Sequence, residues 1–308
     1  MLSGGIKVTL VYGSLQLGLL YGIMVLGIYI SFRILNIPDL TTEGSFTFGL
    51  AVSAMMAEIG HPYLGLLLSV VVGAAAGCVT GVLQTKLKIH PVLAGIITMS
   101  GLHSINIFVL KNRANVSLMN KDTLFSAARK LFSGLDKDIV RLIVVLAAAV
   151  IVIVLLALFF KSHFGLCIRA TGDNQDMLSA SSVNVNITKI AALGLSNACI
   201  AFAGGLTTQY QNYADLNSGT GMLVVGLASV IIGEAIFGKR GVTVGLVSAI
   251  TGSVIYQFII SLATKYSIFP TQMFKLVAAV IVTVALAIPA IKEAAGKMKT
   301  RIGGRRDA

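Results

Sequence analysis

Charged residues are scarce in this sequence. Asp, Glu, Lys and Arg make up 12% of its 308 residues, whereas hydrophobic residues make up 56% and the mean hydropathy is +0.89. A soluble domain carries about twice that charged fraction, so the composition excludes an ordinary soluble globular protein. Several apolar runs reach the roughly 20 residues that cross a bilayer, and they must be helices because lipid satisfies no backbone hydrogen bonds. We therefore predict an all-α polytopic membrane helix bundle, a single domain over residues 1–308.

Cysteine and proline are also rare. The three cysteines, Cys78, Cys167 and Cys199, lie in or beside apolar runs without metal-ligand spacing, so we interpret them as small hydrophobic residues and predict no metal site. Five prolines stand against 32 glycines, a ratio that favours a tightly packed bundle.

Glycines recur at helical spacing in three places. Gly73, Gly77 and Gly81 fall every four residues on one face of a predicted span, and a face without side chains lets another helix approach closely. The same spacing recurs in two further pairs, Gly18 with Gly22 and Gly241 with Gly245. We expect packing within the chain at any one of these sites; a subunit or gating interface is the alternative.

No arrangement of residues supports catalysis. The sequence shows no Ser/His/Asp, Cys/His or paired-carboxylate constellation in a suitable context, so we predict no catalytic residue and no enzyme activity. One segment, Gly233–Lys239, fits the phosphate-loop pattern G-x-x-x-x-G-K. The next residue is Arg240, where a Ser or Thr must hold magnesium, and an apolar run precedes the segment instead of a strand. We therefore exclude nucleotide binding there.

The net charge of +12 does not indicate a nucleic-acid partner. The basic residues gather at the ends of apolar runs, as the positive-inside bias of membrane proteins produces. The basic tail at 292–308 is predicted to be cytoplasmic. Nine apolar runs precede it, at about 8–30, 41–58, 63–85, 91–110, 140–160, 187–207, 221–237, 241–263 and 273–290. We predict about nine spans, with eight to ten as the range.

Counting back from the tail assigns each loop to a side. Arg33, Lys86–Lys88, the segment 161–186 and the pair Lys239-Arg240 fall inside, and each of the four contains basic residues. The N-terminus then lies outside as a retained span, because no small-residue cleavage site follows it. The loop 111–139 disagrees, since six basic and three acidic residues give it a net charge of +3 on the outside. Either a span is miscounted or this loop is basic for its own reason.

A polar segment at 161–186 separates two long apolar runs. Within it, small and apolar residues alternate with polar ones at helical spacing, which predicts one or two short amphipathic helices. A membrane protein that places such helices outside the bilayer usually presents them to a soluble partner.

A second polar segment, Asn36–Gly49, interrupts the apolar pattern at membrane depth. Pro38 breaks a helix, and Asp39, Thr42 and Glu43 are costly in hydrocarbon unless they face protein or water. Thr41 or Thr42 can cap the following helix, whose first turn suits Glu43. The segment is either a capped inner loop between two spans or a broken helix beside a permeation path.

Three polar residues in other runs complete the candidates. His103 and Asn106 lie three apart on one helix face, and we expect interhelical hydrogen bonds from them in preference to ligand binding. With Asp39, Thr42 and Glu43 they form the tentative translocation-pathway set. Glu234 is expected to pair with Lys239 or Arg240.

Several of these segments resemble one known family. The stretch Phe164–Leu206 looks like the cytoplasmic coupling loop of permease subunits of ATP-binding-cassette (ABC) importers, in the ribose and branched-chain amino-acid branch. Asp39–Ser45, Gly81–Leu93 and Val230–Gly245 resemble further family motifs, in the right order. On this resemblance the ATPase-coupling residues are Arg169, Gly172, Asp173, Asn174, Ser182 and Asn184. Ser182 stands where the family usually has a glycine, and Glu43 resembles a subgroup associated with amino-acid uptake, including aromatic amino acids.

The resemblance implies a permease subunit without its own ATPase in the bacterial cytoplasmic membrane. It binds no cofactor directly, because ATP is used by a partner ABC ATPase subunit. Two copies are expected to enclose a pathway for a small solute, an amino acid by preference. An extracytoplasmic substrate-binding protein is expected to dock near 111–139 and 208–220.

Two other classes of function compete with this reading. An ion-coupled secondary transporter would use membrane-buried carboxylates such as Asp39, Glu43 and Glu58, and would show an inverted repeat that the sequence lacks. A purely structural membrane protein leaves the polar segment at 161–186 unexplained.

Overall fold

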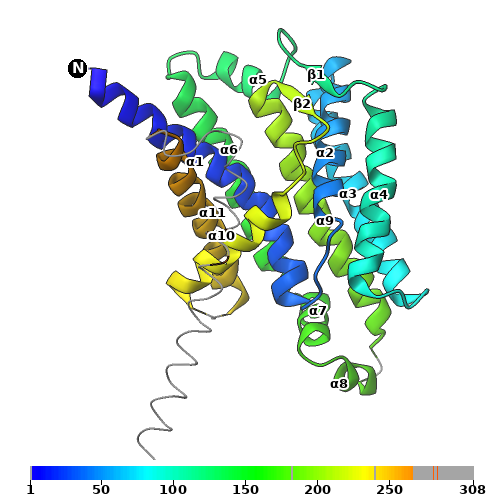
Figure 1. Cartoon of the computed structure of the whole chain (residues 1–308). Coiled ribbons are helices and arrows are strands. Elements are labelled where there is room, and N and C mark those ends of the chain that lie inside the picture. The colour runs from blue at the N-terminus through cyan, green and yellow to red at the C-terminus, as the bar shows by residue number, and fades with distance from the viewer. Residues whose placement is uncertain (1, 182, 239–240, 266–279, 281–282, 284–308) are drawn as a thin grey trace, which may run out of the picture.

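The computed structural model describes residues 2–181, 183–238, 241–265, 280 and 283. Nearly all ordered structure is helical, as Figure 1 shows. The elements are α1 (Leu2–Tyr29), the π-helical turn η1 (Ile30–Ile34), α2 (Thr42–Glu58), α3 (Pro62–Thr85), α4 (Pro91–Val109), β1 (Asn115–Ser117), α5 (Leu124–Leu131), α6 (Lys137–Lys161), α7 (His163–Asp173), α8 (Gln175–Ala180), α9 (Val185–Gln211), β2 (Tyr213–Asp215), α10 (Met222–Phe237) and α11 (Val242–Lys265). The predicted all-α membrane bundle is confirmed.

Helix α9 runs through the centre of the bundle. It packs on α1, α2 and α3, and most of its residues are buried. The α3 glycines Gly73, Gly77 and Gly81 lie directly against the α9 backbone, so that an added Cβ would collide with it. The predicted glycine face is therefore confirmed, and its partner is another helix of the same chain.

Six helices of the described part are long and apolar enough to cross a membrane: the first helix over Leu10–Ile34, then α3, α4, α6, α9 and α11. The predicted count of about nine is not confirmed. The 41–58 and 221–237 runs form α2 and α10, which have only 17 and 16 residues. The run at 273–290 and the tail at 292–308 lie outside the described residues.

The loops of the bundle gather at two opposite ends (Figure 1). Helices α7 and α8 lie at one end with the C-terminal end of α1, the α3–α4 turn, the end of α10 and the start of α11. These are the segments that the charge pattern assigns to the inside. Helix α5 and the strands lie at the other end, so the described loops have the alternating arrangement that the sequence predicts.

The two loops expected on the outside are joined by a short sheet. Strands β1 and β2 pair antiparallel, with Asn115 opposite Asp215. Below the sheet, Gln209 of α9 accepts a hydrogen bond from the Leu124 backbone at 2.8 Å and donates to Ser53 Oγ and the Pro62 carbonyl at 3.1 and 2.8 Å. One side chain thus ties together α2 and the starts of α3 and α5.

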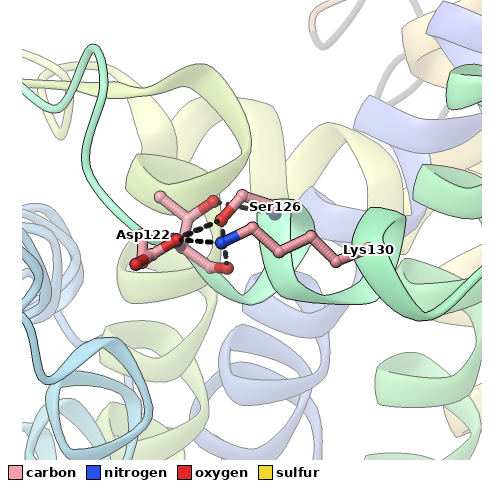
Figure 2. A network of polar contacts seen from close by, with 4 residues as sticks. Asp122, Ser126 and Lys130 are labelled. Atoms are coloured by element: carbon pink, nitrogen blue, oxygen red, sulfur yellow. Dashed lines mark hydrogen bonds and ion pairs between the residues drawn. The ribbon is translucent and has the colours of Figure 1, made fainter. Parts of the chain in front are cut away.

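Two basic residues of the segment 111–139 form ion pairs with carboxylates. Arg113 makes a two-bond ion pair with Glu58 at the end of α2, at 2.7 and 3.0 Å. Figure 2 shows Lys130 bound to Asp122 at 2.9 Å, next to Ser126 at the start of α5. The Lys130 ammonium holds the pKa of Asp122 below its usual range. Two of the six basic side chains are therefore neutralised by neighbours.

Candidate functional site

The polar segment at 161–186 folds into two short helices, which we call the elbow (α7 and α8). Ser162 caps α7 by accepting a hydrogen bond from the Gly165 backbone at 3.3 Å, and Asn174 caps α8 by accepting from Met177 at 3.0 Å. Such side chains satisfy the free N–H groups of a helix start. The prediction of one or two short helices, made from the helical spacing of apolar residues, is confirmed.

The predicted coupling residues occupy different places in the elbow. Asp173 and Asn174 are exposed at the α7–α8 turn, whereas Arg169 is half-buried. Asn184 caps α9 through a bond from the Asn186 backbone at 3.0 Å. Ser182, the position where a glycine was expected, lies outside the described residues.

Gly172 holds the elbow against the bundle. An added Cβ there would collide with the carbonyl oxygen of Ile34 in η1. The Asn36 side-chain amide donates to the Gly172 carbonyl at 3.0 Å, and the hydroxyls of Thr171 and Thr188 lie 2.7 Å apart. Helix α7 is therefore fixed both to the connection between α1 and α2 and to the start of α9.

A polar cavity of about 290 Å³ opens beside the elbow. Arg169 and Asp173 line it from α7, and Arg33 and Glu234 line it from η1 and α10. Arg33 and Glu234 form a two-bond ion pair, in which Nη2 lies 2.7 Å from Oε2. Paired bonds of this kind are charge-assisted and geometrically specific.

Glu234 has a partner that the sequence did not indicate. The expected partners Lys239 and Arg240 lie outside the described residues. The side chain pairs with Arg33, which is 201 residues away in sequence and close in space because α10 packs along α1.

Asp39 is buried at the heart of the second polar segment, with 3% of its surface exposed. Its Oδ1 accepts from the Thr41 backbone at 2.9 Å, and its Oδ2 accepts from Nδ2 of Asn197 in α9 at 2.7 Å. The side-chain oxygen of Asn197 has no partner. The carboxylate thus joins the start of α2 to the central helix.

The expected threonine cap on α2 is wrong. Thr41 stands at the cap position without a capping bond from its side chain; its hydroxyl lies 2.8 Å from that of Thr80 in α3. The Thr42 hydroxyl donates to the Asp39 carbonyl at 3.0 Å. The Thr41 hydroxyl is taken by α3 and the Thr42 hydroxyl by the preceding turn, so neither is available to cap α2.

Glu43 reaches across to another helix. It lies in the first turn of α2, as predicted, and its Oε1 accepts from the Gly221 backbone at 2.9 Å. Gly221 is the N-cap residue that immediately precedes α10. A carboxylate at a helix N-terminus is stabilised by the helix dipole, so Glu43 fixes that end of α10.

His103 and Asn106 do not share a buried face. Asn106 is buried, and its Nδ2 donates to the Gly44 carbonyl at 3.2 Å, which confirms the expected interhelical bond. His103 is exposed, so its expected interhelical bond is wrong. The face of α4 that packs on α2 follows Thr98, Leu102 and Asn106, and His103 falls beside it.

Several known proteins are similar to this chain in sequence. A family profile described as "Branched-chain amino acid transport system / permease component" matches residues 10–286. A "tyrosine transport system permease protein" of Clostridioides difficile is 34% identical over 259 residues, which are 84% of each chain. A "ribose import permease protein" of Haemophilus influenzae is 25% identical over 68% of this chain and 63% of its own. A "galactose/methyl galactoside import permease protein" of Escherichia coli is 26% identical over 76% and 68%. No solved structure matches significantly.

Proposed function

The chain belongs to the family of permease components of branched-chain amino acid transport systems, and on that premise we propose that it forms the amino-acid pathway of an ATP-driven importer. It is a multi-pass protein of the bacterial plasma membrane and a transport subunit of the ABC class. The observation that carries the mechanism is the attachment of the elbow to the α1–α2 connection through Gly172 and Asn36.

The elbow is the surface that we assign to the ATPase subunit. It projects from the bundle and exposes charged Asp173 and apolar Met177, and apolar Ile187 is exposed at the adjoining start of α9. Exposed apolar side chains with a polar rim favour a protein contact. Asn174 and Asn184 hold the shape of this surface by capping its helices.

Movement of the elbow has a direct route into the bundle. Gly172 packs on Ile34, and Asn36 binds the same turn. A displacement of α7 must therefore shift the segment between α1 and α2, which carries Asp39. Because Asp39 is bonded to Asn197, this shift reaches the central helix.

Helix α10 is held at both ends by residues of the same region. Glu43 binds the backbone at its start, and Arg33 binds Glu234 near its end. Both partners flank the α1–α2 connection. We infer that α10 tilts when the elbow moves, and that this tilt opens and closes the pathway between two copies of the chain.

The remaining partners follow from the class of transporter. A substrate-binding protein delivers solute to the end of the bundle opposite the elbow, where the β1–β2 sheet joins the loops 111–139 and 208–220. The ATPase alone binds ATP. We assign Asp39, Thr42, Glu43 and Asn106 to the inner structure that borders the pathway, and His103 to the surface that a second copy would meet.

An amino acid is the solute that we propose. The relative named as a tyrosine transport permease has higher identity and coverage than the two sugar permeases cited above. Glu43 also resembles the amino-acid subgroup at the start of α2.

Uptake by a reconstituted complex tests this proposal. The chain would be placed in liposomes with an ABC ATPase and a binding protein encoded beside it, and uptake of labelled tyrosine and ribose would be measured. We expect ATP-dependent tyrosine uptake and none of ribose. Ribose uptake would refute the solute class, and uptake driven by an ion gradient without ATP would establish the secondary-transporter alternative.

A further inference from the structure

An apolar groove runs along one side of the helix bundle. It has a volume of about 590 Å³ and is walled by α3, α6 and α9. Leu124 and Phe132 close its end beside α5, and every lining side chain is apolar apart from the thiol of Cys199. Helix α6 packs on α1, α5, α7 and α11 and stands away from α3 and α9, which leaves the groove between them.

The character of α6 indicates that lipid surrounds it. Among the six candidate spans, α6 has the highest mean hydropathy, 3.5, and the smallest buried share, 17%. Close helix pairs in membranes use small residues at their contact, and the glycines of α3 are already turned to α9. The groove wall instead carries branched side chains such as Leu66, Val70 and Ile151, which suit a flexible chain better than a second helix.

Basic side chains lie at the junction of α5 and α6, two elements that also border the groove. Arg129, Lys137 and Arg141 line a second cavity, of about 180 Å³, at the junction of α5 and α6. Arg129 and Lys137 are exposed and make no ion pair within the described residues, although Asp136 and Asp138 lie near them in sequence. Arg141 stacks on the Tyr210 ring at 5.1 Å.

Exposed apolar residues lie at the end of α5 and on its connection to α6. Leu131 is 78% exposed, and Phe132 and Leu135 follow it on that connection. A helix with one apolar side and basic residues on the other typically lies in the headgroup region of a bilayer. The junction of α5 and α6 therefore offers both exposed apolar side chains and positive charge.

We propose that an anionic phospholipid binds here, with one acyl chain in the α3–α6–α9 groove and its phosphate at Arg129 and Lys137. The occupant belongs to the leaflet at the end of the bundle opposite the elbow. Burial of the chain against apolar walls drives binding, and the two cations select a negative headgroup because each basic residue near a membrane surface attracts anionic lipid. The proposal does not depend on the solute or on ATP.

Native mass spectrometry of the purified full chain, offered phosphatidylglycerol, phosphatidylcholine or inorganic phosphate, tests the site. Wild type is expected to retain phosphatidylglycerol in preference to phosphatidylcholine, and phosphate alone is expected to bind poorly. Arg129→Gln with Lys137→Gln should reduce that preference by roughly fivefold per charge. Lys121→Gln, at the same end but away from both cavities, should leave it unchanged.

A variant that fills the groove distinguishes binding of the lipid acyl chain from binding of the lipid headgroup. Ala147→Trp places a large ring in the groove and should lower retention of both lipids several-fold, whereas Val150→Trp, on α6 but outside the groove, should not. Equal retention by Ala147→Trp and wild type would refute the acyl-chain site. A disulfide between two copies through Ile151→Cys would show that a second chain fills the groove instead.

Discussion

Arg33 and Glu234 join the end of the first helix to α10 by two hydrogen bonds across a gap of 201 residues in sequence. Their side chains are 27% and 18% exposed, so water screens the pair only partly. The pair also lines the cavity that holds Arg169 and Asp173 of the elbow. This position makes it the clearest target for separating ATP hydrolysis from transport.

Removal of one partner should uncouple the complex. Glu234→Gln leaves Arg33 without its carboxylate, at a cost of about 1–3 kcal/mol for a partly buried group, and should release the end of α10. We expect uptake to fall at least fivefold while the partner ATPase continues to turn over in the reconstituted complex. The exchange Arg33→Glu with Glu234→Arg should recover part of the coupling. Full uptake by Glu234→Gln would exclude the ion pair from the transport cycle.

Cysteines in the elbow should crosslink to the ATPase. Asp173→Cys, in a background without native cysteines, places a thiol on the exposed α7–α8 turn, and we expect a crosslinked product with the co-purified ATPase. Ser133→Cys, exposed at the opposite end, is the matched control and should give none. Labelling of position 173 by an impermeant reagent outside intact cells would contradict both the contact and the predicted topology.

Replacement of Gly172, which packs on Ile34, should decouple the elbow from the bundle. Gly172→Ala brings a methyl group into the Ile34 carbonyl, so α7 must move away and lose the Asn36 bond. We expect a large loss of ATP-driven uptake with a modest loss of thermal stability. Gly134→Ala, where nothing lies within 4 Å of the added carbon, is the control. Normal uptake in Gly172→Ala would mean that this contact does not transmit the movement.

The charge of Asp39 can be tested with its isostere. Asp39→Asn keeps an acceptor for Thr41, but its amide N–H then faces Nδ2 of Asn197, and Asn197 cannot flip without losing its bond to the Leu193 carbonyl at 3.0 Å. We expect a modest loss of thermal stability and a marked fall in uptake. Asp39→Ala removes the carboxylate that Nδ2 of Asn197 binds, and should cost about 1–3 kcal/mol of the free energy of unfolding.

Glu43→Gln is the companion variant. It keeps an acceptor for Gly221 and loses the charge at the start of α10, worth about 0.3–1 kcal/mol. Unchanged uptake in both isosteric variants would return Asn36–Gly49 to the role of a structural connection.

The sequence predicts those features that depend on neighbours along the chain. The elbow helices follow from local periodicity and from caps such as Asn174, and the glycine face of α3 follows from four-residue spacing. The partners of Glu43, Gln209 and Glu234 do not follow from the sequence, because they lie between about 80 and 200 residues away. The sequence suggests Lys239 or Arg240 for Glu234, and both lie outside the described residues; the pairing with Arg33 could not be foreseen from spacing along the chain.

Two of the predicted spans are shorter than expected for a related reason. The runs that became α2 and α10 are apolar, but polar contacts at Asp39, Glu43 and Gly221 begin these helices within the bundle instead of at its edge. Hydropathy records that a stretch is apolar and does not record where a tertiary contact starts the helix. His103 was assigned to the wrong side of α4 because a three-residue spacing does not define which of two adjacent faces is buried.

Gln209 and the β1–β2 pair form a fixed point at the end of the bundle opposite the elbow. They bind the ends of α2, α3, α5 and α9 to one another far from the elbow, so these helices cannot slide apart there. A force applied at α7 must then appear as rotation about that fixed end, with the largest displacement beside the ATPase and the smallest beneath the binding protein. Small displacements of the elbow would thus reach the opposite end of the bundle as changes in the tilt angles of these helices.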